Sequence, residues 1–143
     1  MTSMIRVVLL AHNEGESIGS VLLQLRKQLT AAGSGFRVYV VNDGSTDDTV
    51  VRAERLSGDL LLTVLNHETN LGVARAFDTG LRAALGDSDS DDVIVTMEAD
   101  GTNQAKVVGA MADKLHQGCD VVCASRFREG GGYLHFPWKR HLF

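Results

Sequence analysis

The chain has 143 residues, of which 44% are hydrophobic, and it carries a formal net charge of −4. This length fits one domain with a substantial core, and the acidic balance argues against binding of nucleic acid through a basic surface. No apolar run approaches the roughly 18 residues of a membrane span, and the N-terminus lacks the pattern of a signal peptide, so we expect a cytoplasmic protein.

Apolar runs and helical periodicities alternate along the chain. Continuous apolar runs predict buried strands, and apolar residues spaced three or four apart predict helices. The predicted strands are 5–11, 36–41, 60–65, 93–97 and 119–124, and the predicted helices are 14–32, 47–56, 73–85 and 104–116. This alternation predicts an α/β fold with a mostly parallel, Rossmann-like sheet and helices on both faces.

Local signals add detail to this prediction. Ser45 or Thr46 is expected to cap helix 47–56, and Asn13 either caps the first helix or lines a pocket. Cys119 and Cys123 lie on the fifth predicted strand, about 13 Å apart, which is too far for a disulfide. We expect both thiols to be buried and reduced. The acidic turn 87–92 is interpreted as solvated, because it lacks the spacing of a calcium loop.

Acidic residues follow two of the predicted strands. Asp43 comes after strand 36–41, and Glu98 and Asp100 come after strand 93–97. Ligands of parallel sheets bind beyond the carboxyl ends of the strands, so we expect both clusters in one crevice. Carboxylates at positions i and i+2 of a strand point to the same side and could face one hard cation such as Mg²⁺ or Mn²⁺. This combination suits a nucleotide whose diphosphate needs a divalent cation.

Other segments could line the same crevice. Residues 11–14 end the first strand, and residues 70–72 open a helix whose N-terminus favours anions. Arg126 follows the last predicted strand, and both Arg126 and Arg140 could hold phosphate through paired N–H donors. Each segment also has a structural alternative: a helix cap, a turn or a surface ion pair. No dinucleotide-binding or P-loop motif occurs in the sequence.

Taken in order, these segments resemble the family 2 glycosyltransferases of the GT-A fold. The resemblance extends from Ile5 to Arg140 and rests on Ala11-His12-Asn13-Glu14, Asn42-Asp43-Gly44-Ser45-Thr46-Asp47, Asn70-Leu71-Gly72, Glu98-Ala99-Asp100 and Ala124-Ser125-Arg126-Phe127. Ser125-Arg126-Phe127, Gly130-Gly131-Gly132 and Trp138-Lys139-Arg140 are similar to the polyprenyl-phosphate (dolichol-phosphate) mannosyltransferase branch. The resemblance implies inverting transfer of a sugar from a nucleotide-diphosphate donor, GDP-mannose or a UDP-sugar, to an acceptor such as a polyprenyl phosphate.

The resemblance also implies roles for single residues. The nucleotide would be bound by Ala11, His12, Glu14, Asp43, Glu98 and Ala99. Asp100, assisted by Glu98, would ligate Mg²⁺ or Mn²⁺ on the diphosphate. The catalytic set would be Asp100 with Arg126 and Arg140, which would hold phosphates of the donor or the acceptor.

The sequence departs from the family pattern at several positions. Asn42 replaces the first Asp of Asp-Asp-Gly-Ser, Glu98 replaces the first Asp of D-x-D, and His12 replaces an aromatic residue before Asn-Glu. Thr102 stands where the mannosyltransferase branch often has Gln.

Two regions are expected along the chain. Residues 1–127 would form the nucleotide-sugar-binding domain, and residues 128–143 would begin an acceptor-side region that is cut short. The apolar side chains of this tail would need a cover. We expect it from a second copy of the chain or from peripheral contact with the inner face of the membrane.

Two other functions stay open at this point. Glu98-Ala99-Asp100-Gly101-Thr102 is similar to the D-x-D-G-T loop of haloacid-dehalogenase-type phosphatases, with Glu98 in the place of the nucleophilic Asp. The other alternative is a truncated glycosyltransferase-like module that binds a nucleotide or a partner without turnover.

Overall fold

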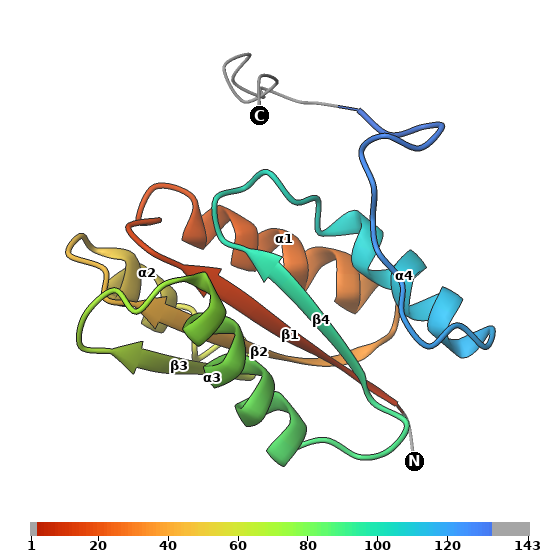
Figure 1. Ribbon diagram of the computed structural model, residues 1–143, viewed down its shortest axis with the longest axis horizontal. Helices are drawn as coiled ribbons and strands as arrows, with labels where there is room; N and C mark the ends of the chain where they lie inside the picture. Colours follow the sequence, from red (N-terminus) through yellow and green to blue (C-terminus); the bar gives the residue numbers. More distant parts are fainter. Residues whose placement is uncertain (1–2, 133–143) are drawn as a thin grey trace.

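The computed structural model describes residues 3–132 and alternates strands with helices (Figure 1). In chain order the elements are β1 Met4–Ala11, α1 Ile18–Ala31, β2 Gly35–Asp43, α2 Thr49–Glu54, β3 Leu62–His67, α3 Val73–Gly86, β4 Val93–Glu98 and α4 Lys106–His116. The elements predicted up to residue 116 are confirmed, with their ends displaced by at most four residues.

The four strands form one parallel sheet in the order β3-β2-β1-β4. From β1 the chain adds β2 and β3 on one side, and then returns to place β4 on the other side of β1. The direction of winding therefore reverses at β1. Parallel sheets bind ligands at such a reversal, beyond the carboxyl ends of the strands.

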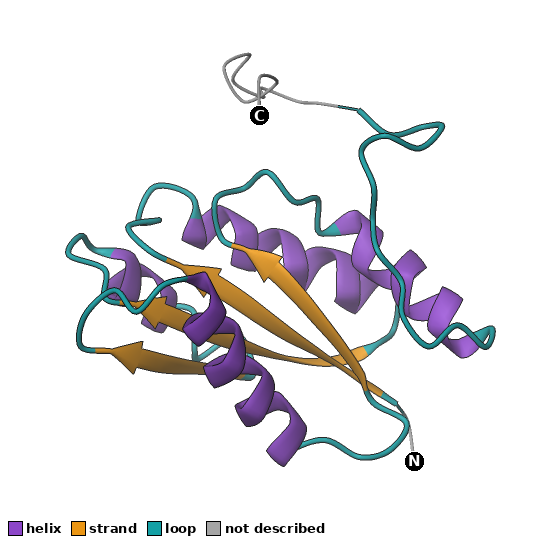
Figure 2. Ribbon diagram, in the orientation of Figure 1, coloured by secondary structure: helices purple, strands orange, loops and turns teal. Residues whose placement is uncertain are grey.

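Helices cover both faces of the sheet, as the alternation predicted (Figure 2). Side chains alternate along each strand, so Val7 and Leu9 pack in the core under α1, α2 and α4. Val8 and Leu10 pack in a second core under α3. A Cβ at Gly80 of α3 would lie 2.3 Å from a methyl carbon of Val8, so α3 approaches the sheet closely only because this residue is glycine.

Helix α1 supplies the largest share of helical side chains to the first core. Its fully or nearly buried residues recur every three or four positions: Ile18, Val21, Leu22, Leu25 and Leu29. Burial of each leucine side chain contributes about 1.5–3 kcal/mol of transfer free energy. Within residues 3–132, the helices are all too short or too polar to span a membrane.

The prediction of a fifth strand at 119–124 is wrong. This segment follows α4 as irregular, largely exposed chain, and Cys119 and Cys123 are exposed instead of buried. The prediction rested on apolar composition, but a strand also needs a neighbour for its backbone hydrogen bonds. In the described part of the chain, the sheet ends at β4, and this segment does not pair with the free edge of that strand.

The predicted cap of α2 is also wrong. The N-cap residue is Asp48 and not Ser45 or Thr46, and its side chain makes no capping bond. The neighbouring Asp47 accepts instead from the backbone N–H of Thr49 at 3.0 Å. In a run of several Ser, Thr and Asp residues, tertiary contacts decide which side chain hydrogen-bonds to the first turn of the helix.

The acidic turn 87–92 is only partly solvated, because it holds a buried arginine. Arg6 is 5% exposed and donates from Nε to Asp92 at 2.8 Å and from Nη1 to Asp87 at 3.0 Å. The backbone N–H of Met4, together with Arg6, holds the pKa of Asp92 below its ordinary value. This network joins the amino-terminal edge of the sheet to the loop between α3 and β4.

Candidate functional site

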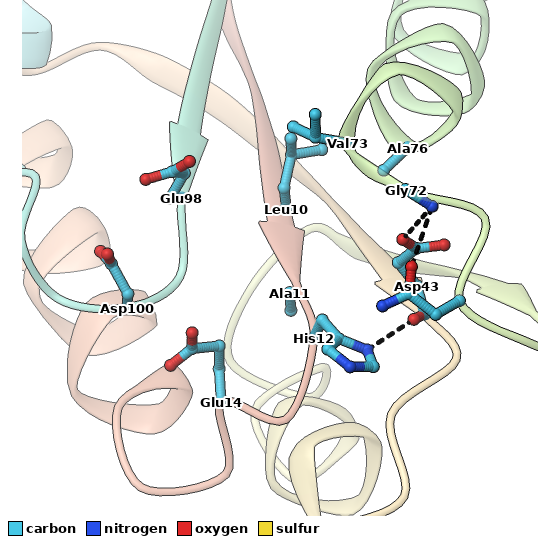
Figure 3. Close-up of a pocket in the computed structure, with 11 residues that line it drawn as sticks. Leu10, Ala11, His12, Glu14, Asp43, Gly72, Val73, Ala76, Glu98 and Asp100 are labelled. Carbon is cyan, nitrogen blue, oxygen red and sulfur yellow. Dashed lines mark hydrogen bonds between the residues drawn. The ribbon is translucent and has the colours of Figure 1, made fainter. Parts of the chain in front are cut away.

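A cavity of about 360 Å³ lies at the carboxyl ends of β1, β2 and β4, beside the first turn of α3 (Figure 3). Most of the residues predicted for the site line it: Ala11, His12, Glu14, Asp43, Glu98 and Asp100. Ala99 does not, because it is fully buried, with its N–H donated to Leu10 and its carbonyl accepting from Ser17. The cavity occupies the reversal point of the sheet.

The alternation of side chains explains which residues reach this cavity. Leu10 and Glu98 are partners in the β1–β4 register, and both lie on the face of the sheet that carries α3. Helix α3 packs on β1 and β2 and reaches β4 much less. Asp43 is consequently 5% exposed beneath the helix, whereas the side chain of Glu98 stays open to solvent.

Asp43 is bound within the protein more fully than the sequence suggested. Its Oδ1 accepts from His67 Nδ1 at 2.7 Å and from the N–H of Leu71 at 2.8 Å, and its Oδ2 accepts from the N–H of Gly72 at 2.9 Å. Burial by itself would raise the pKa of Asp43, but these three donors outweigh it and hold the pKa below its ordinary value. Asp43 is therefore an ionised group that offers a ligand only acceptor atoms.

His12 stands beside Asp43 and is oriented by it. Its Nδ1 lies 2.7 Å from the backbone oxygen of Asp43. A carbonyl oxygen only accepts, so Nδ1 carries a proton in this contact, while Nε2 lies 3.4 Å from the side-chain nitrogen of Asn13.

Asn13 does not cap α1, whose N-cap residue is Ser17. Asn13 has φ 55°, and its Oδ1 accepts from the N–H of Thr46 at 2.8 Å. It joins the loops that follow β1 and β2, and its role is to hold the rim of the site.

A second group of carboxylates occupies the opposite side of the cavity. Figure 3 shows Glu98, Asp100 and Glu14 on one side and Asp43 with His12 on the other. Asp100 accepts from the N–H and the hydroxyl of Thr102 at 2.9 and 2.8 Å. Both bonds fall on Oδ1, so within the described chain Oδ2 is left for a ligand.

The donor set of Glu98 and Asp100 fits one hard divalent cation. Among residues 3–132, no group of three or more His, Cys, Asp or Glu side chains is arranged to hold a metal ion. Mg²⁺ is usually bound by one or two carboxylates, with substrate phosphates and water completing the shell. Two carboxylates beside an open cavity meet that requirement, and they would bind the cation together with a phosphate ligand.

Of the two predicted phosphate-binding arginines, only Arg126 is described, and it does not line this cavity. Arg126 lines a second cavity of about 450 Å³, whose other wall includes Thr102 and Lys106 at the start of α4. Because Thr102 follows Asp100 by two residues, the second cavity begins near the carboxylates of the first. Arg140 lies outside the described residues.

The sequence reasoning missed His67. It is the partner of Asp43 in the β2–β3 register, and the pair before it is also polar, since Asn42 donates to Asn66 at 2.9 Å. The signal was present in the sequence, because both strands end in Asn followed by a titratable residue. Recognising it required the register of two separate strands.

Comparison with known proteins relates this chain to a protein family. The model of the family described as Glycosyl transferase family 2 matches residues 6–142. The Dolichol-phosphate mannosyltransferase of Pyrococcus furiosus is 27% identical over 138 residues, which are 96% of this chain and 37% of that protein. The chain spans 37% to 53% of the length of three curated relatives.

Two solved structures share the fold. The mannosyltransferase PcManGT of Pyrobaculum calidifontis, in complex with GDP-Man and Mn²⁺, has a TM-score of 0.63 and 25% identity, covering 80% of this chain and 32% of that one. Glucosyl-3-phosphoglycerate synthase of Mycobacterium tuberculosis, in complex with UDP, has a TM-score of 0.61 and 29% identity, covering 81% of this chain and 41% of that one. The α/β fold predicted from the sequence is confirmed as that of these glycosyltransferases.

Proposed function

The chain belongs to glycosyl transferase family 2, and we propose that its cavity binds the nucleotide-diphosphate donor of a sugar transfer. One observation carries this proposal. Asp43 lies on one side of the cavity, and Glu98 and Asp100 lie on the other, at the reversal point of a parallel sheet. A nucleoside diphosphate has the matching chemistry, with N–H and O–H donors at one end and a cation-binding diphosphate at the other.

The side of Asp43 and His12 would hold the base and the ribose. The ionised Asp43 presents acceptors only, which pair with a ring N–H or a ribose hydroxyl, and the His12 ring lies beside it. The same negative charge repels a phosphate group. The nucleotide is therefore oriented with its base toward α3 and its diphosphate toward β4.

The side of Glu98 and Asp100 would hold the diphosphate through Mg²⁺ or Mn²⁺. A divalent cation at this place neutralises the charge that develops on the leaving nucleotide. Thr102 fixes the orientation of the Asp100 carboxylate through its two hydrogen bonds. Asp100 is thus preorganised for the cation, and Glu98 reaches the same region from the end of β4.

The proposal extends to the sugar donor and to the acceptor. GDP-mannose and a UDP-sugar are both supported as donors, since the two neighbouring structures were solved with GDP-Man and with UDP. A polyprenyl phosphate is supported as acceptor by the tail motif and by the dolichol-phosphate mannosyltransferase relative. Arg126 and Arg140 would hold its phosphate at the inner face of the membrane. That phosphate is already anionic, so the attack requires no strong general base.

A module that binds the nucleotide without turnover is the second candidate. It is favoured by the place of Arg126, which lines the second cavity and not the first. The haloacid-dehalogenase alternative has less support, because the family match and both structural neighbours are glycosyltransferases.

Calorimetric titration of the purified chain with GDP, UDP, GDP-mannose and UDP-glucose, with and without Mn²⁺, tests this proposal. We expect one base to be preferred, binding to depend on Mn²⁺, and Asp100→Ala to abolish it. Asp120→Ala, at an exposed aspartate outside both cavities, is the matched control and should bind as the unaltered chain does. Absence of binding in all four titrations would contradict the proposal. An assay of sugar transfer to a polyprenyl phosphate then distinguishes an active enzyme from a module that binds the nucleotide without turnover.

A further inference from the structure

We propose that His67 is a positioning residue that sets nucleotide affinity by holding Asp43 against the loop 69–72, an inference that rests on the proposed function. His67 is 10% exposed in its side chain and belongs to β3. It does not line the cavity. Its influence on a ligand must therefore pass through Asp43, which does.

Both ring nitrogens of His67 are engaged. Nδ1 lies 2.7 Å from Asp43 Oδ1, and Nε2 lies 2.8 Å from the hydroxyl oxygen of Thr79 in α3. The carboxylate only accepts, so Nδ1 carries a proton and donates it. Nε2 forms the second hydrogen bond, with the Thr79 hydroxyl. The ring is therefore held from both sides, which fixes where its Nδ1–H points.

Asp43 transmits this constraint to the loop before α3. Besides His67, it accepts from the N–H groups of Leu71 and Gly72. Gly72 lines the cavity together with Asn70 and Val73. One carboxylate thus joins the end of β2, the end of β3 and the wall of the cavity.

Apart from the close approach of Gly44 to Thr69 and Asn70, the described structure holds this loop weakly. Leu71 is 53% exposed and Val73 is 59% exposed, so apolar burial contributes only weakly there. Gly72 also donates to Asn70 at 2.9 Å, but that bond lies within the loop itself. Segments with few buried apolar contacts open at low free energy, and the bonds to Asp43 are the ones that tie this loop to the sheet.

Loss of the His67 bond should therefore loosen the cavity wall. The buried carboxylate would lose its side-chain donor, and its two backbone bonds would open more often. Hydrogen bonds to charged groups are the stronger class, so we expect the amides of Leu71 and Gly72 to exchange about tenfold faster or more. Nucleotide affinity should fall several-fold, because Asp43, which would contact the nucleotide, is then no longer held in one place.

A pair of near-isosteric variants tests this inference. The side-chain nitrogen of asparagine can take the place of Nδ1, whereas that of glutamine can take the place of Nε2. His67→Asn should therefore keep the donation to Asp43 and give up Thr79, and His67→Gln should do the reverse. We expect His67→Asn to match the unaltered chain in amide exchange and in nucleotide affinity with Mn²⁺. His67→Gln should exchange about tenfold faster at Leu71 and Gly72 and bind the nucleotide several-fold more weakly.

Several results would overturn the inference. Equal losses in the two variants would indicate a general structural role of His67. Faster exchange in His67→Gln with unchanged nucleotide affinity would show that the bond does not set affinity. Fast exchange of the Leu71 and Gly72 amides in the unaltered chain would contradict the premise that Asp43 holds this loop. This measurement needs no variant, so it remains informative if a variant fails to fold. If the unaltered chain binds no nucleotide, the proposed function and the affinity claim both fail, while amide exchange still tests the bond itself.

Discussion

Substitution of Gly44 by alanine should strongly destabilise the fold, because this residue brings the turn after β2 against the loop 69–72. Gly44 has φ +67° and its added Cβ would lie 2.3 Å from the carbonyl carbon of Thr69 and 2.4 Å from the nitrogen of Asn70. The left-handed conformation costs a residue with a Cβ about 1–2 kcal/mol, and displacement of packed atoms adds about 1–3 kcal/mol. The free energy of unfolding should fall by about 2–5 kcal/mol.

Urea denaturation followed by circular dichroism measures this loss. Gly109→Ala in α4 is the matched control, since an added Cβ there meets nothing within 4 Å. Alanine is the better helix former, so the control should raise the free energy of unfolding by about 0.5–1 kcal/mol. A Gly44→Ala midpoint equal to that of the unaltered chain, with an unchanged slope, would refute the close approach of the two loops.

Three further results are expected. Asp92→Asn removes one of the two carboxylate partners of the buried Arg6 and leaves Asp87, so urea denaturation should show a loss of about 1.5–3 kcal/mol, with a loss below about 0.5 kcal/mol contradicting the network. The folded protein lowers the pKa of Asp43. Ionised Asp43 therefore stabilises the fold at a pH above the unfolded pKa of about 3.9. This stabilisation is lost as the pH falls through the lower pKa of the folded state. Between pH 7 and pH 3 the stability of Asp43→Asn should accordingly fall less than that of the unaltered chain, and an equal fall would contradict this linkage. Cys119 and Cys123 are exposed and should both react with a thiol reagent in the native chain as fast as in denaturant, whereas protection of either would indicate a covered segment.

Strands β1 and β2 could be predicted because their runs are apolar enough to be buried on both faces. A run such as the one from Val7 to Leu10 is buried whichever way the strand turns, so composition alone finds it. Strands β3 and β4 are less buried, but they pair with β2 and β1. The run at 119–124 is also largely apolar, yet it forms no strand, so pairing with a neighbour, a property of the whole fold, decides the outcome.

Site residues could be placed from the sequence where a single segment of chain determines their position. Glu98 ends β4 and Asp100 follows it by two residues in the turn; both line the cavity, and their role at a metal stays a prediction. His67 could not be found in this way, because its contact with Asp43 depends on the register between β2 and β3. Local sequence predicts which residues share a strand end, and long-range pairing decides which of them are bound within the protein.

Paramagnetic broadening of amide signals by Mn²⁺, in the presence of GDP or UDP, tests the central claim most directly. The proposed site predicts that broadening centres on Glu98 to Thr102 and the facing residues His12 and Glu14, that it requires the nucleotide, and that it disappears in Asp100→Ala. Broadening centred on the acidic turn 87–92, or broadening that is unchanged without nucleotide, would contradict the account.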